Sequence, residues 1–83
     1  MISNCIASEG FEISPRFRQS VEERIARLER DAETDEAVAG TLVDGDHIRR
    51  QMWLVAAERA EALRMRLFLD RAGTRLPRPL IAL

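Results

Sequence analysis

The sequence contains no lysine and no tyrosine, and only one cysteine and one histidine among its 83 residues. A single cysteine, Cys5, cannot form an intramolecular disulfide, and one cysteine with one histidine cannot complete a structural zinc site. No stretch approaches the roughly 20 apolar residues of a membrane-spanning helix, and residues 1–7 lack the features of a signal peptide. We therefore predict a protein of a reducing, cytoplasmic compartment that neither enters nor crosses a membrane.

The charge that is present is divided between the two halves of the chain. Residues 1–46 carry eleven acidic residues and five arginines, whereas residues 47–83 carry eight arginines and three acidic residues. The halves therefore have net charges of −6 and +5 in a chain whose net charge is −1. This division predicts that the two halves face each other, or that the second half faces an anionic partner.

The length and composition predict a single small helical domain covering residues 1–83. The chain is 46% hydrophobic and 33% charged, which is typical of a folded globular protein. A chain this short buries only about 60–65% of the surface that its unfolded form exposes. Because such a core is thin, we expect a homodimer or another protein partner to contribute to stability.

The first half of the chain predicts a short N-terminal strand or extended arm followed by a helix. Residues 1–13 mix β-branched and small residues. Ser14 and Pro15 form a helix start, since serine caps the free amides and proline presets φ at the first helical position. Apolar residues then recur at three- and four-residue steps, which predicts an amphipathic helix near residues 15–31 that ends or is interrupted in the acidic segment 31–36.

The second half predicts one long helix at residues 46–72. Residues 36–43 fit a strand or a short helix, and residues 44–46 form a turn ending in a helix cap. Residues 47–72 contain no glycine or proline, and their apolar residues form one stripe, although residues 63–69 also alternate as in a strand. The stripe comprises Ile48, Met52, Val55 or Ala56, Ala60, Leu63 and Leu67. Gly73 should stop the helix and leave residues 76–83 as an extended apolar tail.

The chemical groups that could form an active site are few. Asp44, Asp46 and His47 lie within four residues and could hold a divalent cation, but a turn that starts a helix explains the same residues. His47 could activate Cys5 as a nucleophile, but no local motif accompanies the pair. We therefore predict no catalytic residue, no metal site and no cofactor.

The residues predicted to bind a partner lie on the long helix and in the tail. Residues 48–69 have apolar side chains around more than one face, which a domain with one other good helix cannot cover. Aromatic residues, methionine and leucine commonly supply the binding energy of such surfaces, and arginines set orientation and encounter rate. The apolar candidates are Met52, Trp53, Leu63, Leu67, Phe68, Leu80 and Ile81, and the electrostatic candidates are Arg49, Arg50, Arg64 and Arg66.

The segment FEISPRFRQSVEERIARLER, residues 11–30, resembles the opening of ribosome hibernation-promoting factors. In that family a first strand leads through a Glu-x-Ser/Thr-Pro turn into an amphipathic helix. The resemblance implies three further strands, a second long helix packed on the sheet, and binding to ribosomal RNA. It covers about a quarter of the chain, and the sequence departs from the family pattern after Asp31, so no RNA-binding residue is carried over.

Taken without the resemblance, the sequence predicts an all-α or nearly all-α helical hairpin, with a homodimer as the expected assembly. The predicted function is non-catalytic protein–protein interaction, as a regulator, adaptor or inhibitor that uses helix 46–72 and the C-terminal tail. The alternative function is RNA or ribosome binding through the arginine-rich second half, because arginine binds phosphate in a bidentate manner.

Overall fold

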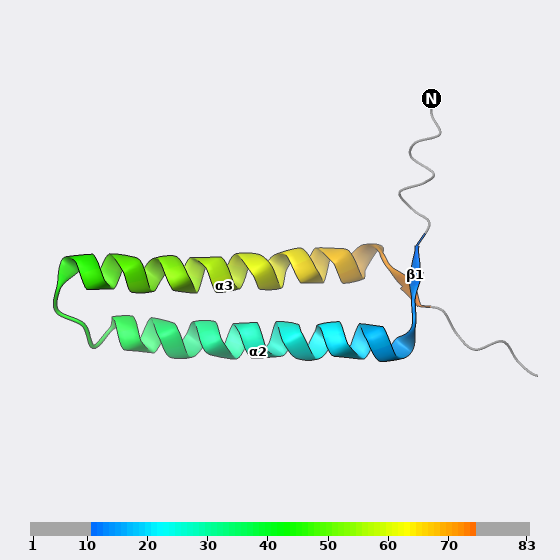
Figure 1. Cartoon of the computed structure of the whole chain (residues 1–83), viewed down its shortest axis with the longest axis horizontal. Helices are drawn as coiled ribbons and strands as arrows, with labels where there is room; N and C mark the ends of the chain where they lie inside the picture. Colours follow the sequence, from blue (N-terminus) through cyan, green and yellow to red (C-terminus); the bar gives the residue numbers. More distant parts are fainter. Residues whose placement is uncertain (1–10, 75–83) are drawn as a thin grey trace, which may run out of the picture.

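The computed structural model describes residues 11–74 of the chain. Its elements follow in the order β1 (Glu12–Ile13), α2 (Pro15–Ala39), α3 (Gly45–Arg71) and β2 (Gly73–Thr74). The two helices form an antiparallel hairpin, and the two strands pair in parallel at the end opposite the connecting loop, which we call the open end (Figure 1). The predicted helical hairpin with a short N-terminal strand is confirmed. The residues predicted as the start of the arm, Cys5 and the tail 76–83 lie outside the described residues.

Both helices begin at a side-chain cap. The Ser14 hydroxyl accepts a hydrogen bond from the Phe17 amide at 3.1 Å, and Pro15 occupies the first turn as predicted. The carboxylate of Asp44 accepts from the amide of Asp46 at 2.8 Å and caps α3. The helix therefore begins at Gly45, slightly earlier than the sequence predicted, because the residue that opens the turn also caps the helix.

The first helix is longer than predicted. Instead of ending near residue 31, α2 continues through the acidic segment to Ala39. Residues 16–39 contain no glycine or proline, and the burial of Ala32 and Ala39 adds packing energy that outweighs the unfavourable charge near the helix end. Gly40 then ends the helix, and its amide donates to the carbonyl oxygens of Glu36 and Ala37. The segment 36–43 is thus a helical end and a loop rather than a strand.

The second helix, α3, runs without interruption across residues 63–69, so their strand-like alternation does not produce a strand. Ala72 is the C-cap and has extended backbone angles, with φ −82° and ψ 132°. The amide of Gly73 then donates to the carbonyl oxygen of Phe11 at 2.9 Å. The helix therefore ends just before Gly73, and the chain turns into the short parallel pairing with β1.

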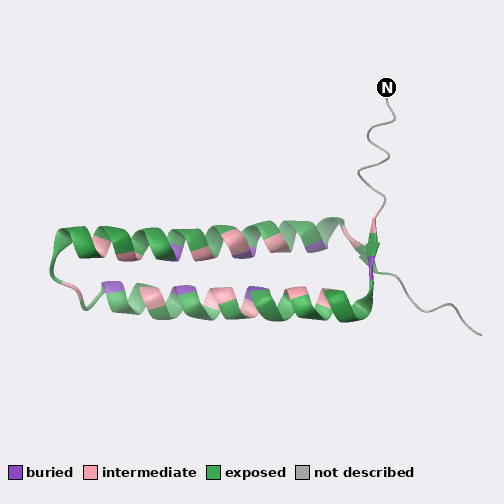
Figure 2. Cartoon of the chain, in the orientation of Figure 1, coloured by how far each residue is buried: buried purple, intermediate pink, exposed green. Residues whose placement is uncertain are grey.

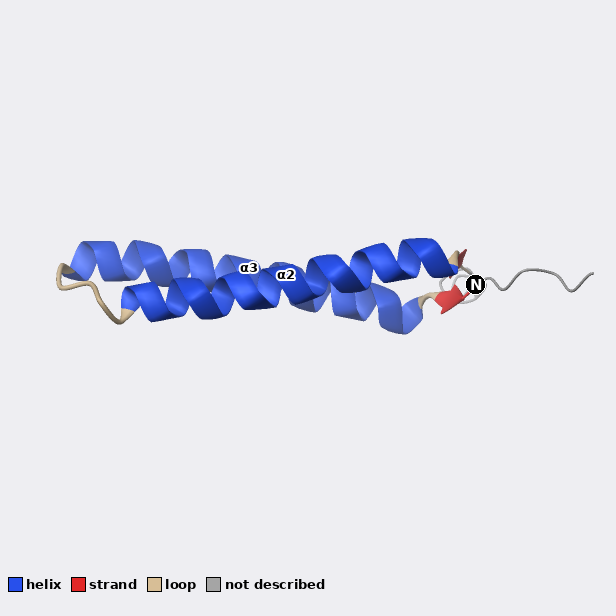
Figure 3. Cartoon of the chain, turned by 90° about the horizontal axis from the view of Figure 1, so that it is seen from below, coloured by secondary structure: helices blue, strands red, loops and turns tan. Residues whose placement is uncertain are grey.

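The core lies in the seam between the two helices. Buried residues recur every seven positions on each helix, at Ile25, Ala32 and Ala39 on α2 and at Val55, Ala62 and Leu69 on α3. This spacing is typical of a coiled coil. Figure 2 shows the buried residues on the facing sides of the helices, and Figure 3 shows the helices crossing at a shallow angle. Three of these six residues are alanines, which let the two backbones approach closely.

The largest apolar cluster lies toward the open end of the hairpin. Ile13 of β1 joins Ile25, Ala62 and Leu69 in one buried cluster. Partly buried apolar residues surround it, namely Phe11, Val21, Leu28, Met65 and Ala72. The strand pair therefore closes an apolar cluster that the two helices would leave open to water.

Candidate functional site

A row of apolar residues lies on the exposed side of α3, outside its buried contact with α2, although Leu63 at the edge of the row also lines a hollow with Glu29 and Glu33 of α2. We call it the outer row, and it comprises Trp53, Ala56, Ala60, Leu63 and Leu67. The residues alternate in steps of three and four, which places them on one face of a helix. All five are exposed, and the exposed fractions of the large side chains are 79% for Trp53, 55% for Leu63 and 50% for Leu67. The hairpin thus leaves a coiled-coil-like apolar seam open to solvent.

The single apolar stripe predicted for this helix was wrong, because its members belong to two different faces. Val55 is buried against α2 and Ile48 is partly buried, whereas Ala60 and Leu67 are exposed. A four-residue step turns the helix by about 40° beyond a full turn, so repeated steps of four move gradually around the helix. Met52, 37% exposed, lies between the buried and the outer faces.

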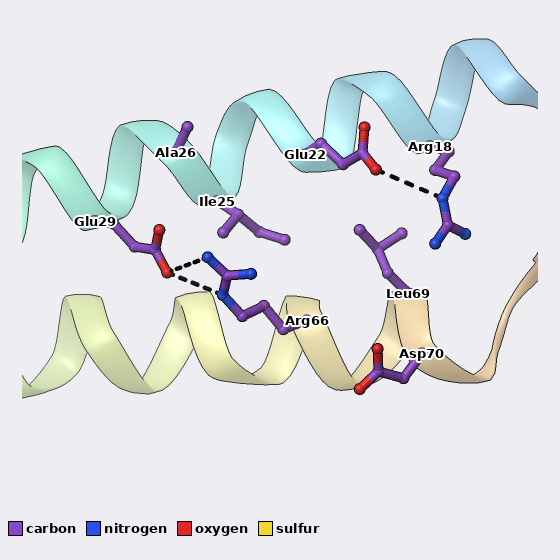
Figure 4. Close-up of a pocket in the computed structure, with 8 residues that line it drawn as sticks. All are labelled: Arg18, Glu22, Ile25, Ala26, Glu29, Arg66, Leu69 and Asp70. Atoms are coloured by element: carbon purple, nitrogen blue, oxygen red, sulfur yellow. Dashed lines mark hydrogen bonds and ion pairs between the residues drawn. The ribbon is translucent and has the colours of Figure 1, made fainter.

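Arginines of α3 on one flank of the outer row are bound to α2. Arg66 donates to one carboxylate oxygen of Glu29 through two nitrogens, at 2.9 and 2.7 Å, and Arg59 donates to Glu36 at 2.7 Å. Figure 4 shows the Arg66–Glu29 contact bridging the two helices. These two ion pairs put acidic side chains of the first half against basic side chains of the second, which is the first of the two arrangements that the charge division predicted.

The opposite flank of the outer row carries a second set of arginines, Arg50, Arg64 and Arg71, at spacings of 14 and seven residues. We call these three residues the arginine row. Arg64 forms an ion pair with Glu61 of its own helix. Arg50 and Arg71 form no ion pair with another side chain of residues 11–74. This flank therefore keeps a net positive charge.

A shallow hollow of about 340 Å³ lies beside Trp53 at the start of α3. Asp46, Arg49, Arg50 and Trp53 line it, and Arg49 forms an ion pair with Asp46. The indole face and the guanidinium group of Arg50 are thus both accessible at one end of the outer row. A partner side chain could contact both groups there.

The hollow drawn in Figure 4 has a different character. It lies across both helices, has a volume of about 260 Å³, and is lined by Arg18, Glu22, Ile25, Ala26, Glu29, Arg66, Leu69 and Asp70. Four of its five charged side chains form ion pairs with one another, Arg18 with Glu22 and Arg66 with Glu29. Its floor is the apolar core, where Ile25 and Leu69 point toward each other. The apolar floor and the Arg66–Glu29 pair join the two helices, whereas the Arg18–Glu22 pair lies within α2, and the pairing leaves little charge for a ligand.

Phe68, which the sequence placed among the partner-binding residues, contacts other aromatic residues at the open end. Its ring centroid lies 5.2 Å from that of Phe11 and 6.2 Å from that of Phe17, the latter in an edge-to-face arrangement. Phe68 therefore joins α3 to the residue that precedes β1 and to α2. Trp53 is the aromatic residue of α3 that remains free for a partner.

One feature of the hairpin interface was not predicted from the sequence. Glu58 of α3 lies against Asp35 of α2, and its Oε1 atom is buried with no hydrogen-bond partner among residues 11–74. The pKa of Glu58 is raised, first by desolvation, then by the hydrogen bond that protonated Glu58 can make with Asp35, and by the negative charges of Asp35 and Asp31. Gln51 lies in the same region and donates to the backbone carbonyl oxygen of Asp35 at 2.9 Å.

The candidate cation cluster has a structural role at the start of α3. Asp44 accepts hydrogen bonds from the backbone amides of Asp46 and His47, at 2.8 and 3.4 Å. Within residues 11–74, no group of three or more metal-binding side chains is close enough to hold an ion. Cys5, Leu80 and Ile81 lie outside the described residues, so the predictions made for them stay predictions.

Comparison with protein-family models, with curated sequences and with solved structures gives no match to this chain. Within residues 11–74, neither helix is sufficiently long and apolar to cross a membrane. The case for a function therefore depends on the geometry of α3 itself.

Proposed function

We propose that this protein is a non-catalytic protein–protein interaction module that binds its partner through the exposed side of α3, in a reducing, cytoplasmic compartment. The main support for the proposal is the exposure of the outer row, whose three large side chains are each at least half exposed. An apolar seam with three- and four-residue spacing is the geometry by which helices pack on one another. A regulator, adaptor or inhibitor could use such a surface.

The size of the hairpin core supports the same proposal. The buried apolar residues among residues 11–74 number seven, and three of them are alanine, so the hairpin gains little from burial in isolation. Covering the outer row with another helix would remove Trp53, Leu63 and Leu67 from water as well. Association would therefore add to the stability of a fold with a small core.

The proposal is tested by measuring complex formation with the outer row intact and interrupted. The full chain is analysed by light scattering after size exclusion, alone and with an added amphipathic helical peptide that carries a leucine seam. We expect a complex with the wild type and its loss in Leu63→Asp or Trp53→Asp, since each places a charge in the apolar contact. Ser20→Asp on the exposed side of α2 is the control and should retain the complex.

Circular dichroism of each variant shows whether the helices remain folded. A folded Leu63→Asp or Trp53→Asp protein that keeps every complex of the wild type would show that the outer row is not the binding surface. A wild-type chain that forms no complex with itself or with the peptide would also contradict the proposal.

A further inference from the structure

We propose that the outer row binds an acidic amphipathic helix of another protein, whose carboxylates face the arginines beside the row. This inference rests on the proposed function and adds the chemistry of the partner. Its basis is the combination of one apolar seam with the arginine row along one flank, where Arg50 and Arg71 form no ion pair with side chains of residues 11–74. Three kinds of molecule could cover the outer row: an acidic helix of another protein, a second copy of this chain, or an anionic membrane.

The shape of the outer row fits a helix. Trp53 stands at one end and Leu63 and Leu67 at the other, and Ala56 and Ala60 lie between them. Small residues in the middle of the row let the backbone of a second helix come close. The large residues at the two ends of the row then pack against the sides of that helix. A partner with leucine-like residues at three- and four-residue steps would fill the space above the two alanines.

The charge around the row selects an acidic partner. Six arginines lie in line with the row or beside it, namely Arg49, Arg50, Arg59, Arg64, Arg66 and Arg71. Arg59 and Arg66 form ion pairs with glutamates of α2. By contrast, Arg50 and Arg71 form no ion pair with side chains of residues 11–74. A helix that places carboxylates opposite the arginine row therefore gains attraction at Arg50 and Arg71 in particular, whereas a basic helix meets repulsion there.

A second copy of this chain does not meet that requirement. If two α3 helices paired antiparallel through their outer rows, the arginine row would face the arginine row of the other copy. If they paired parallel, the arginine row would face Arg59 and Arg66 instead. Antiparallel pairing brings the two arginine rows together, which disfavours it, and parallel pairing offers the arginine row no unpaired carboxylate, because Glu36 and Glu29 are already bound to Arg59 and Arg66.

The exposed side of α2 cannot serve as the partner surface either. The residues that follow one another along it, at three- and four-residue steps, are Gln19, Glu23, Ala26, Arg30, Glu33 and Ala37, and only the two alanines are apolar. This surface offers no large side chain to cover Trp53 or Leu63. This row of α2 therefore does not provide a complementary surface for the outer row, and the exposed Phe17 and Val38 of α2 lie outside it.

An anionic membrane is a poorer match than an acidic helix. Glu29 and Glu36 lie at the border of the outer row, where they bind Arg66 and Arg59, and an anionic surface would repel them. A helix that inserts into a membrane interface also benefits from large side chains along its apolar face, whereas the middle of this row is alanine. A narrow helix can contact the row and the arginine row without covering the glutamates.

The fluorescence of Trp53 provides the test, because it is the only tryptophan of the chain and is 79% exposed. The full chain is titrated with two designed helical peptides that share one leucine seam and carry glutamate or lysine on the flanks. We expect a saturable blue shift of the emission with the acidic peptide and at least roughly tenfold weaker binding of the basic peptide. The preference should decrease as the salt concentration rises.

Charge-reversal variants show which arginines cause the preference for the acidic peptide. Replacing the arginine row, as Arg50→Glu with Arg64→Glu and Arg71→Glu, should weaken binding of the acidic peptide by roughly tenfold and strengthen binding of the basic one. The control replaces three exposed arginines of α2, as Arg16→Glu with Arg27→Glu and Arg30→Glu, and changes the net charge equally. Its affinities should stay within about twofold of the wild type, because these residues lie far from the outer row.

Four outcomes overturn the inference. One is equal binding of the two peptides, and another is an equal loss of affinity in both charge-reversal variants. The third is a salt-resistant dimer of the chain alone that Leu63→Asp dissociates, which would assign the row to a second copy. The fourth is a blue shift with anionic phospholipid vesicles but not with the acidic peptide. Equal binding that Leu63→Asp abolishes would leave the proposed function standing while removing the charge selectivity.

Discussion

Glu58 of α3 faces Asp35 of α2 across the hairpin, so two carboxyl groups meet in an interface whose other contacts are mainly apolar. Two neighbouring carboxylates that are partly removed from water destabilise the hairpin when both are ionised. A proton held between them removes one charge and allows one group to donate to the other. The pair therefore makes the stability of the hairpin depend on pH.

We predict that Glu58→Gln stabilises the hairpin at neutral and higher pH. The folded state raises the pKa of Glu58, so protonated Glu58 adds stability that is fully present below the ordinary pKa of a glutamate. That stability is lost as the pH rises through the raised value. Urea unfolding followed by circular dichroism at a series of pH values, from about pH 4 to about pH 8, measures the difference.

A neutral glutamine keeps an amide that can donate to Asp35 at every pH, so the variant should lose most of this pH dependence. Glu33→Gln on the exposed surface of α2 is the control and should keep the dependence of the wild type. A Glu58→Gln protein that is less stable than the wild type at about pH 8 would show that the ionised carboxylate is favourable in place.

Substitutions at two alanines of α3 distinguish the inner face from the outer row. Ala62 is 2% exposed between the helices, whereas Ala60 is exposed on the outer row. We expect Ala62→Leu to lower the free energy of unfolding by about 1–3 kcal/mol, because the larger side chain must push the helices apart. Ala60→Leu, the same chemical change two residues away, should alter it by less than about 0.5 kcal/mol. Similar losses in both variants would place both residues in the core.

The elements of the fold could be predicted from the sequence because their boundaries have local causes. Ser14 and Pro15 start α2 through groups that lie within one turn, and Asp44 does the same for α3. The end of α2 could not be placed, because the acidic segment 31–36 locally disfavours the last turns of a helix, while the burial of Ala32 and Ala39, which favours them, depends on contacts with α3. Tertiary packing therefore extended the helix beyond the limit that local charge suggested.

The two faces of α3 were harder to predict, because alanine is common on both and contributes little to a hydrophobic pattern. A strict seven-residue count would have separated Val55, Ala62 and Leu69 from the exposed residues. The same count places Glu58 on the inner face, since it lies three residues after Val55. Its pairing with Asp35 depends on the register between the helices, which the lengths of the helices and the loop decide together.

The ion pair between Arg66 and Glu29 should contribute little to stability at physiological salt. Both side chains are about half exposed, so water screens their attraction. A double-mutant cycle with Arg66→Gln and Glu29→Gln should give a coupling energy of about 0.5 kcal/mol that decreases as salt is added. Unfolding measurements on the four proteins provide the coupling energy. A salt-independent coupling several times larger would mean that the pair is shielded from solvent.

The two aromatic residues of α3 that the sequence grouped together should respond differently to truncation. Phe68 contacts the rings of Phe11 and Phe17, so Phe68→Ala should lower the free energy of unfolding by about 1–2 kcal/mol, less than for a fully buried phenylalanine because Phe68 is 36% exposed. Trp53 lies on the outer row, so Trp53→Ala should change stability by less than about 0.5 kcal/mol and yet weaken partner binding.

Circular dichroism follows unfolding in both variants, and light scattering with the leucine-seam peptide follows binding, so neither measurement needs the tryptophan. Destabilisation by Trp53→Ala comparable to that of Phe68→Ala would mean that Trp53 supports the hairpin itself. A stable Trp53→Ala protein that no longer binds would show that Trp53 contributes to partner binding, whereas Phe68 stabilises the hairpin. That difference follows from geometry, because the hairpin interface and the outer row occupy different sides of one helix.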